Sequence, residues 1–381
     1  AMRPDTLAGR VATTASSTDT LIVEGVMGLF DGIHLPDRAD AGSTADLAAL
    51  TGWPVVLIVD AAKQAASVGA VVRGFASHRA DVTIAGVIFN RVASPAHEAV
   101  LHAATKAAVP DIHLLGSVGR NPAMAVPERH LGLVQAGEHA DLERFIEAAA
   151  AAVSETVDID ALVALAQPGG ISLPDAPAPE PLPPLDQRIA VARDAAFAFS
   201  YPATLDGWRT AGAEILPFSP LANEAPDPSA GAIYLPGGYP ELHAGTLAAA
   251  GRFLGGLRDA ANRGVDIFGE CGGYMVLGRG LVDADGTRHA MADLLPVETS
   301  FAQRRLHLGY RVARLHRDGP LGAAGARYHG HEFHYASILD EQTNTPLFAA
   351  ENARGEDLGA AGAVAGSVCG SFIHLIDRAT P

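Results

Sequence analysis

The sequence contains very little cysteine and lysine, and each shortage excludes a class of protein. Only two cysteines occur in 381 residues, too few for a disulfide framework, so we expect a reducing, cytoplasmic setting. Lysine occurs only as Lys63 and Lys106, and the formal net charge is −16. Nucleic acid is therefore not expected as a partner, because binding to phosphates requires clustered positive charge. Long apolar runs and a basic, then apolar, N-terminal region are also missing, so neither a membrane span nor a signal peptide is expected.

A phosphate-binding loop is missing as well. No Gly-x-x-x-x-Gly-Lys-Ser/Thr string occurs, and neither lysine follows a glycine pattern of that kind. Nothing in the sequence replaces the backbone N–H groups and the lysine with which such a loop holds the β- and γ-phosphates of a nucleotide.

A proline-rich segment divides the chain into two halves. Prolines recur from residue 167 to residue 184, and because proline fixes φ and lacks an N–H, an extended and semi-rigid connector is predicted. The sequence therefore predicts a first domain over 1–166, a linker over 167–187 and a second domain over 188–381.

In both halves, short apolar runs alternate with alanine-rich helical stretches. Continuous apolar runs of four to seven residues are typical of strands buried on both faces, and the alternation predicts α/β domains with parallel sheets. A helix is predicted over 141–166. The predicted strands are residues 20–23, 55–59, 84–89 and 112–115 in the first half, and 189–192, 232–235, 265–268, 309–313 and 362–368 in the second.

Cys271 stands at a predicted turn from a strand into a helix. It lies in the string Gly-Glu-Cys-Gly-Gly directly after the strand 265–268, which is the thiol form of a nucleophile on a sharp turn. The flanking glycines permit a tight backbone, and the N-terminus of the following helix favours a thiolate. A small buried cysteine at a glycine-rich turn is the alternative. Cys369 is predicted to be a core residue.

Two further motifs favour the catalytic interpretation. Residues 235–241, Leu-Pro-Gly-Gly-Tyr-Pro-Glu, follow a strand end, and their glycines can direct N–H groups at an oxyanion. Residues 370–377, Gly-Ser-Phe-Ile-His-Leu-Ile-Asp, supply His374. This order resembles that of the class I glutamine amidotransferases, which have a flavodoxin-type fold. The resemblance implies that Cys271 is the nucleophile, that His374 is its base, and that Gly237, Gly238 and Gly272 form the oxyanion site.

The third member of that catalytic group stays open. The family has a glutamate two residues after the histidine, whereas this chain has Ile376 there. Asp377 is the nearest carboxylate in the sequence.

The first half carries two carboxylates, Glu24 and Asp31, at and just beyond the end of its first predicted strand. Carboxylates in that position can hold Mg²⁺ against nucleotide phosphates, although a helix cap or a solvated loop charge is an equally ordinary role. The surrounding string resembles the dethiobiotin-synthetase-like ATP domain, a P-loop NTPase-like fold, of the cobyrinic and hydrogenobyrinic acid a,c-diamide synthases. That resemblance implies ATP and Mg²⁺ as cofactors and places Asn90 beside the adenine. The supporting strings are residues 42–46, 59–60, 86–92 and 127–133.

Members of that family begin with a phosphate loop and a first strand, which this sequence does not contain. We therefore expect an incomplete first domain that lacks its N-terminal part, with impaired ATP binding. A natural relative that has lost ATP binding is the alternative.

Two polar strings lie between the cysteine and the histidine, at residues 304–311 and 328–335. Strand alternation places His329 and His331 on one face and Glu332 and His334 on the other, which separates the ligands that a zinc site would need. A polar edge strand remains an alternative. Both strings match the a,c-diamide synthases, and we expect them to recognise the substrate. The residues expected to do so are Arg304, Arg305, Tyr310, His331, Glu332 and His334.

The resemblance implies a complete reaction. Ammonia freed from glutamine would amidate the a and c acetate groups of a corrin, each activated by ATP as an acyl phosphate. Grouped arginines in an acidic chain suit such a polycarboxylate. The sequence leaves open a cobalt-containing or metal-free corrin, and another tetrapyrrole such as nickel sirohydrochlorin. A stand-alone glutaminase or cysteine hydrolase and a non-catalytic tetrapyrrole-binding module are the rival functions. A homodimer is a further expectation.

Overall fold

The computed structural model describes residues 2–126, 128–129, 132–166 and 182–379. Most of the predicted linker, residues 167–181, thus lies outside the described residues. The chain forms two compact units, Ala8–Pro177 and a second unit that combines Ala1–Leu7 with Ala178–Pro381. The boundary between them falls inside helix α1 (Pro4–Ala15). No helix of the described residues has both the length and the apolar character needed to cross a membrane.

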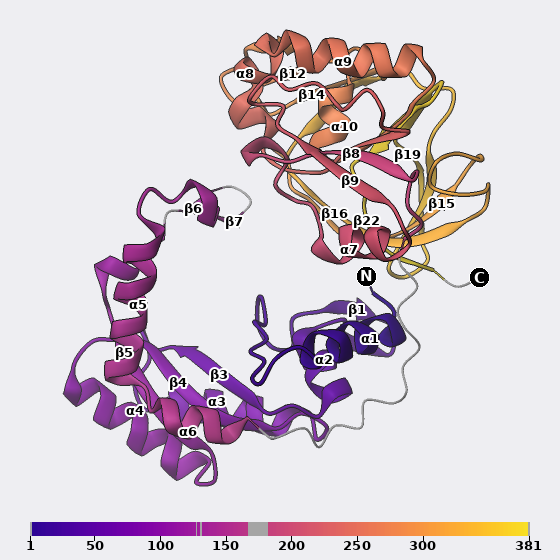
Figure 1. The fold of residues 1–381 in the computed structure, drawn as a ribbon. Coiled ribbons are helices and arrows are strands. Elements are labelled where there is room, and N and C mark those ends of the chain that lie inside the picture. Colours follow the sequence, from indigo (N-terminus) through magenta and orange to yellow (C-terminus); the bar gives the residue numbers. More distant parts are fainter. Residues whose placement is uncertain (1, 127, 130–131, 167–181, 380–381) are drawn as a thin grey trace. The chain divides into compact units, whose positions relative to one another are not determined.

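The first unit is built on a parallel sheet of three strands in the order β3-β4-β5. The strands β3 (Val55–Asp60), β4 (Ile84–Val92) and β5 (His113–Gly119) confirm the three predictions at 55–59, 84–89 and 112–115. Helices pack on the sheet (Figure 1). They are α2 (Thr44–Thr51), α3 (Val68–His78), α4 (Pro95–Ala108), α5 (Leu142–Thr156) and α6 (Ile159–Leu165). Two small antiparallel ribbons complete the unit, β1 (Ile33–Leu35) with β2 (Arg38–Ala41) and β6 (Glu128–Arg129) with β7 (Gly132–Leu133).

The predicted strand at residues 20–23 is wrong. This segment has no regular structure, and Ile22 is 85% exposed. An apolar run becomes a strand only when a neighbour pairs its N–H and C=O groups, and within the described residues no strand lies beside it. The predicted helix over 141–166 is two helices. Val157 leaves the helix to form a bridge with Gly116, and Asp158 caps α6 by accepting from the N–H of Ala161 at 2.9 Å.

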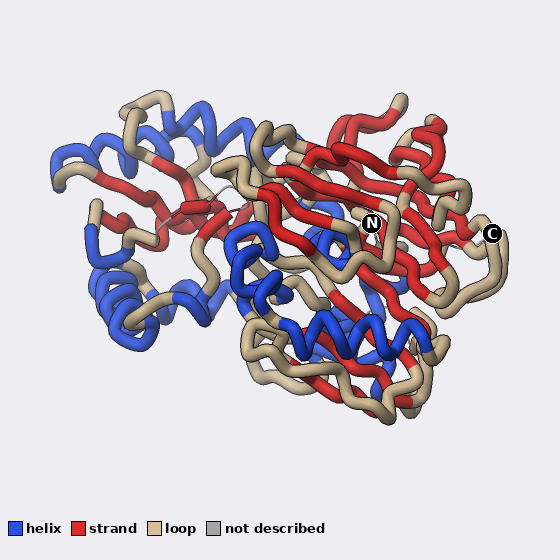
Figure 2. The backbone as a smooth tube through the Cα atoms, turned by 90° about the horizontal axis from the view of Figure 1, so that it is seen from above, coloured by secondary structure: helices blue, strands red, loops and turns tan. Residues whose placement is uncertain are grey.

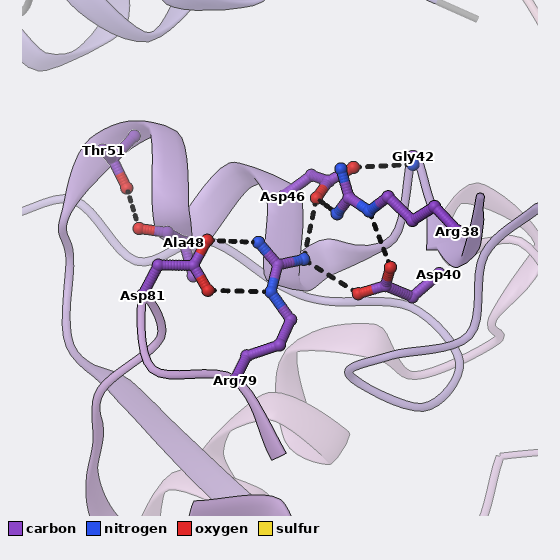
Figure 3. Close-up of polar contacts among 8 residues, drawn as sticks. All are labelled: Arg38, Asp40, Gly42, Asp46, Ala48, Thr51, Arg79 and Asp81. Atoms are coloured by element: carbon purple, nitrogen blue, oxygen red, sulfur yellow. Dashed lines mark hydrogen bonds and ion pairs between the residues drawn. The ribbon is translucent and has the colours of Figure 1, made fainter. Parts of the chain in front are cut away.

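A network of ion pairs joins the segments around α2 in this unit (Figure 3). Arg79, directly after α3, donates to Asp40 at 2.8 Å, to Asp46 at 2.9 Å and to Asp81 at 2.6 Å. Arg38 pairs with Asp40 and Asp46 as well. The hydrogen bond from Arg38, together with Arg79, lowers the pKa of Asp40 to about 2. The network therefore connects β2 and the start of α2 to the turn before β4.

The second unit contains a six-stranded sheet in the order β20-β21-β11-β10-β8-β9. Five strands run parallel, and in chain order they read 2-1-3-4-5, which is the flavodoxin-like order. The parallel strands are β8 (Arg188–Ala192), β9 (Glu214–Phe218), β10 (Ala232–Leu235), β11 (Asp266–Glu270) and β21 (Val368–Ser371). The helices of the unit are α7 (Pro202–Thr210), α8 (Ala244–Ala249), α9 (Gly251–Asn262) and α10 (Gly272–Leu277).

The predicted single strand over 362–368 is a hairpin. Gly366 has φ +60° and turns the chain between β20 (Ala363–Ala365) and β21. The apolar residues that flank Gly366-Ser367 hid the turn in the sequence.

The parallel sheet is covered on both faces, which explains its continuous apolar strands. In β8, Ala190 and Ala192 belong to the core that contains α9 and α10, whereas Ile189 and Val191 belong to a second core. That second core is shared with an antiparallel sheet in the order β19-β18-β15-β16-β22. Figure 2 shows the strands and helices of this unit together. The sequence did not predict this sheet as a separate layer. Its strands are β15 (His307–Leu315), β16 (Arg327–His334), β18 (Phe348–Asn352), β19 (Asp357–Ala361) and β22 (His374–Arg378).

A smaller sheet lies at the side of α10 and has the order β13-β12-β14-β17. Its strands are β12 (Gly280–Val282), β13 (Arg288–Ala290), β14 (Val297–Ser300) and β17 (Ser337–Glu341).

Candidate active site

Cys271 occupies a strained turn between β11 and α10. Its backbone has φ +48° and ψ −101°, a region that costs a side-chain-bearing residue energy and occurs mainly where function requires it. The backbone N–H of Cys271 donates to the carbonyl of Ser371 at 2.8 Å, which fixes the turn to β21. Glycine is required beside it, because a Cβ on Gly273 would overlap the carbonyl of Leu235. This geometry is that of a nucleophile elbow.

His374 begins β22, three residues beyond the end of β21, so the parallel sheet and the antiparallel sheet together bring it to the cysteine. A Cβ placed on Gly237 would lie 2.5 Å from Cε1 and 3.2 Å from Nε2 of His374, and 3.4 Å from Cβ of Cys271. The imidazole and the cysteine therefore face the same glycine from two sides. No hydrogen bond joins thiol and imidazole among the described residues, and such contacts commonly tighten only when substrate binds.

Burial keeps both groups neutral. It raises the pKa of the Cys271 thiol far above its usual range, and the nearby carboxylates Glu241 and Glu270 raise it further, against an opposing hydrogen bond from the N–H of Gly272. Burial, with His331 and His334 close by, lowers the pKa of His374 to about 3. Without substrate the thiol is thus protonated and the imidazole is unprotonated, which is the pair of states that a proton transfer from Cys271 to His374 would start from.

The three glycines predicted for the oxyanion site lie around this pair. Gly237 and Gly238 follow β10, and the carbonyl of Gly237 accepts from the N–H of Phe199 at 2.9 Å. A Cβ on Gly272 would stand 3.0 Å from the amide nitrogen of Gly238. The backbone of Gly272 therefore lies close to the amide of Gly238, beside Cys271.

His331 lies against His374 and not on an open surface. The two rings stack with centroids 4.9 Å apart and 5° between planes, and Nε2 of His331 pairs with the hydroxyl of Tyr201 at 2.6 Å. Tyr201 also meets the ring of His374 edge-on. Sequence reasoning missed Tyr201, since nothing near Cys271 or His374 in the chain points to it.

The other residues of the polar strings form their own contacts. Glu332 accepts from Arg311 at 2.6 Å and lies 3.4 Å from Nε2 of His334. Burial opposes its ionisation, yet the hydrogen bond from His334 and the charge of Arg311 lower the pKa of Glu332 to about 2. Tyr310 pairs with His331 across β15 and β16. No set of three or more candidate metal ligands gathers anywhere in the described part of the chain.

Arg304 and Arg305 lie in the loop before β15. Both are exposed, and within the described residues neither forms an ion pair. They are thus solvated cations of the kind that can receive carboxylates.

In the first unit, Glu24 and Asp31 lie in the irregular segment before β1. Glu24 is exposed, and Asp31 accepts from the N–H of Gly28 at 2.8 Å. Asn90 lies at the C-terminal end of β4, where its side chain accepts from the N–H of Arg91 at 2.8 Å. Arg91, at φ +61°, pairs with Asp60 at the end of the neighbouring β3. The polar ends of β3 and β4 therefore lie side by side, at the sheet edge where α/β folds bind ligands.

Comparison with known proteins assigns both halves. Residues 188–380 match the model of the CobB/CobQ-like glutamine amidotransferase domain, and residues 4–128 match the model of an AAA domain. A hydrogenobyrinate a,c-diamide synthase from Sinorhizobium sp is 54% identical over 387 residues, covering 100% of this chain and 85% of the relative. The enzyme of the same name from Rhodobacter capsulatus is 50% identical, with 96% of this chain and 82% of the relative covered. The chain belongs to the hydrogenobyrinate a,c-diamide synthase family.

Proposed function

We propose that this chain is a glutamine-hydrolysing carbon–nitrogen ligase that amidates the a and c acetate carboxylates of a corrin in cobalamin biosynthesis. The observation that carries the proposal is the nucleophile elbow at Cys271, with His374 facing it across Gly237. The names of the relatives favour hydrogenobyrinate, the metal-free corrin, over a cobalt-containing or nickel-containing tetrapyrrole. A cytoplasmic location accords with two cysteines that are both free thiols.

In the glutaminase half, Sγ of Cys271 attacks the carboxamide carbon of glutamine while His374 takes the thiol proton. The negative charge on the carboxamide oxygen is stabilised by the amides of Gly238 and Gly272. His374 then delivers its proton to the departing nitrogen, and ammonia leaves a thioester on Cys271. Water hydrolyses the thioester, with His374 as base, to give glutamate and the free thiol.

In the synthetase half, an acetate oxygen of the corrin attacks the γ-phosphorus of ATP and ADP leaves. Ammonia then attacks the acyl phosphate carbon, and inorganic phosphate departs to leave the amide. Activation is needed because a carboxylate has no good leaving group. We assign Asn90 to the adenine, and Arg304, Arg305, Tyr310 and the polar strand around Glu332 to the corrin carboxylates.

Mg²⁺ fits the residues present. The ion takes one or two carboxylates together with phosphate oxygens and water, and Glu24 is an exposed carboxylate without an ion pair in the described chain. Glu24, with Asp31 nearby in sequence, would hold the ion, which when bound neutralises charge on the transferred phosphoryl group.

Replacing the nucleophile tests the proposal. In the full-length enzyme, Cys271→Ser should abolish glutamine-dependent amidation and glutamate release, while amidation from added ammonia continues. Cys369→Ser is the matched control, since that thiol is buried in β21 away from the elbow, and it should keep glutamate release. If glutamine and ammonia support amidation equally poorly in Cys271→Ser, the cysteine has a structural role. Glutamate release that never responds to ATP or corrin in the full-length enzyme would favour a stand-alone glutaminase.

A further inference from the structure

The candidate active site leaves one atom of its base without a partner. Nδ1 of His374 is buried and has no hydrogen bond within the described residues. An imidazole that must accept a proton at Nε2 needs its N–H on Nδ1, and a buried N–H without an acceptor is costly. The groups around Nδ1 therefore determine how readily His374 accepts a proton at Nε2.

Glu270 is the carboxylate that faces this atom. Its Oε2 lies 3.9 Å from Nδ1 of His374, and both side chains are 3% exposed. A shift of about 1 Å between the two groups would bring them to hydrogen-bond distance. We propose that Glu270 is the positioning residue for His374, and thus the third member of the catalytic group. This inference rests on the glutaminase function proposed above.

The carboxylate is already held in place. The hydroxyl of Tyr234 donates to Oε2 at 2.7 Å, and the N–H of Leu375 donates to Oε1 at 3.0 Å. Glu270 directly precedes Cys271, and Leu375 directly follows His374. One side chain thus connects the strand that carries the nucleophile with the strand that carries the base.

The other carboxylates close to His374 in sequence or space are engaged elsewhere. Asp377, the nearest in sequence, accepts from the backbone and guanidinium of Arg3 at 2.9–3.1 Å. Glu332 binds Arg311 and His334, and the side chain of Ile376 is apolar. Glu270 alone combines proximity to Nδ1 with full burial among these residues.

The charge of Glu270 suits this role. Burial raises its pKa to about 7, although the hydrogen bonds from Leu375 and Tyr234 oppose the shift. Burial disfavours the ionised form of a carboxyl group, and a positive charge beside it offsets that penalty. Transfer of the thiol proton to His374 creates that charge, and the new ion pair stabilises it.

The test compares variants of the full chain in glutamine hydrolysis. Glu270→Gln should lower kcat by about 10- to 100-fold, the range found when a partner that orients a metal-bound histidine is removed, with KM changed less than about twofold. The rate at which the glutamine analogue 6-diazo-5-oxo-L-norleucine alkylates Cys271 should fall by a similar factor. Asp377→Asn, which alters a buried carboxylate on the strand of His374, should keep kcat within about twofold.

Tyr234→Phe gives an independent readout, because it removes one hydrogen bond to Glu270 and leaves the carboxylate. We expect a smaller fall in kcat, about 3- to 10-fold, again at constant KM. Unchanged kcat in Glu270→Gln would overturn the inference, as would unchanged kcat in Tyr234→Phe if Glu270→Gln does not fold. An equal fall in Asp377→Asn would also overturn it. If the unsubstituted chain neither hydrolyses glutamine nor reacts at Cys271, the proposed function fails instead.

Discussion

Substituting Gly237 by alanine introduces one methyl group between Cys271 and His374. The new Cβ would lie 2.5 Å from Cε1 of His374 and 3.4 Å from Cβ of Cys271. Carbon atoms in contact normally stand about 3.5–4.0 Å apart, so the imidazole must move by about 1 Å. His374 is 3% exposed and packed against His331, so the displacement cannot be absorbed by free rotation.

A displacement of this size in a catalytic group costs on the order of 100-fold in rate, which corresponds to about 2.7 kcal/mol in the barrier. We expect kcat for glutamine hydrolysis, followed through glutamate release, to fall by that factor in Gly237→Ala. Gly255→Ala is the matched control, because a Cβ there meets nothing within 4 Å in α9. It should keep full activity and gain up to about 1 kcal/mol of stability. Activity within twofold of the unsubstituted enzyme in Gly237→Ala would refute the described geometry of the pair.

Three further predictions concern other parts of the chain. Arg79→Gln should lower the free energy of unfolding of the first unit by about 1–3 kcal/mol at pH 7. The low pKa of Asp40 gives stability that is present above pH 4 and lost as pH falls towards 2, so the difference should vanish in acid melts, with exposed Arg73→Gln as control. In the full-length enzyme, Glu24→Gln should weaken Mg·ATP-dependent turnover yet leave alkylation of Cys271 unchanged; loss of both would indicate misfolding. The buried carboxyl of Glu270 has a raised pKa, so its ionisation lowers the stability of the fold as pH rises through about 7. Glu270→Gln should therefore raise the melting temperature at pH 8 more than at pH 5. An equal rise at both pH values would contradict the raised pKa.

Most of the parallel framework could be predicted from the sequence, because strands buried on both faces leave a continuous apolar signal. Ile189–Ala192 is such a run, and the structure divides its side chains between two cores. The antiparallel layer could not be predicted in this way. Its strands mix polar and apolar residues, and its register depends on distant partners such as His331 opposite His374.

The residues of the candidate active site were likewise predictable only in part. The glycines around Cys271 predict a tight turn, because only glycine fits at positions where a Cβ would overlap neighbouring backbone atoms. Glu270 gives no such signal, since its role depends on which atom of His374 it faces once two sheets are packed together. Its position directly before the nucleophile was visible, but chain adjacency alone does not show which way a carboxylate points.

The central claim is that glutamine is hydrolysed through a thioester on Cys271. The most direct measurement is to inactivate the chain with 6-diazo-5-oxo-L-norleucine and locate the adduct by peptide mass spectrometry. We predict one adduct on Cys271 and none on Cys369, with loss of glutamate release in step with labelling and protection by glutamine. Undiminished glutamate release from fully labelled enzyme, or an adduct at Cys369 alone, would contradict the account.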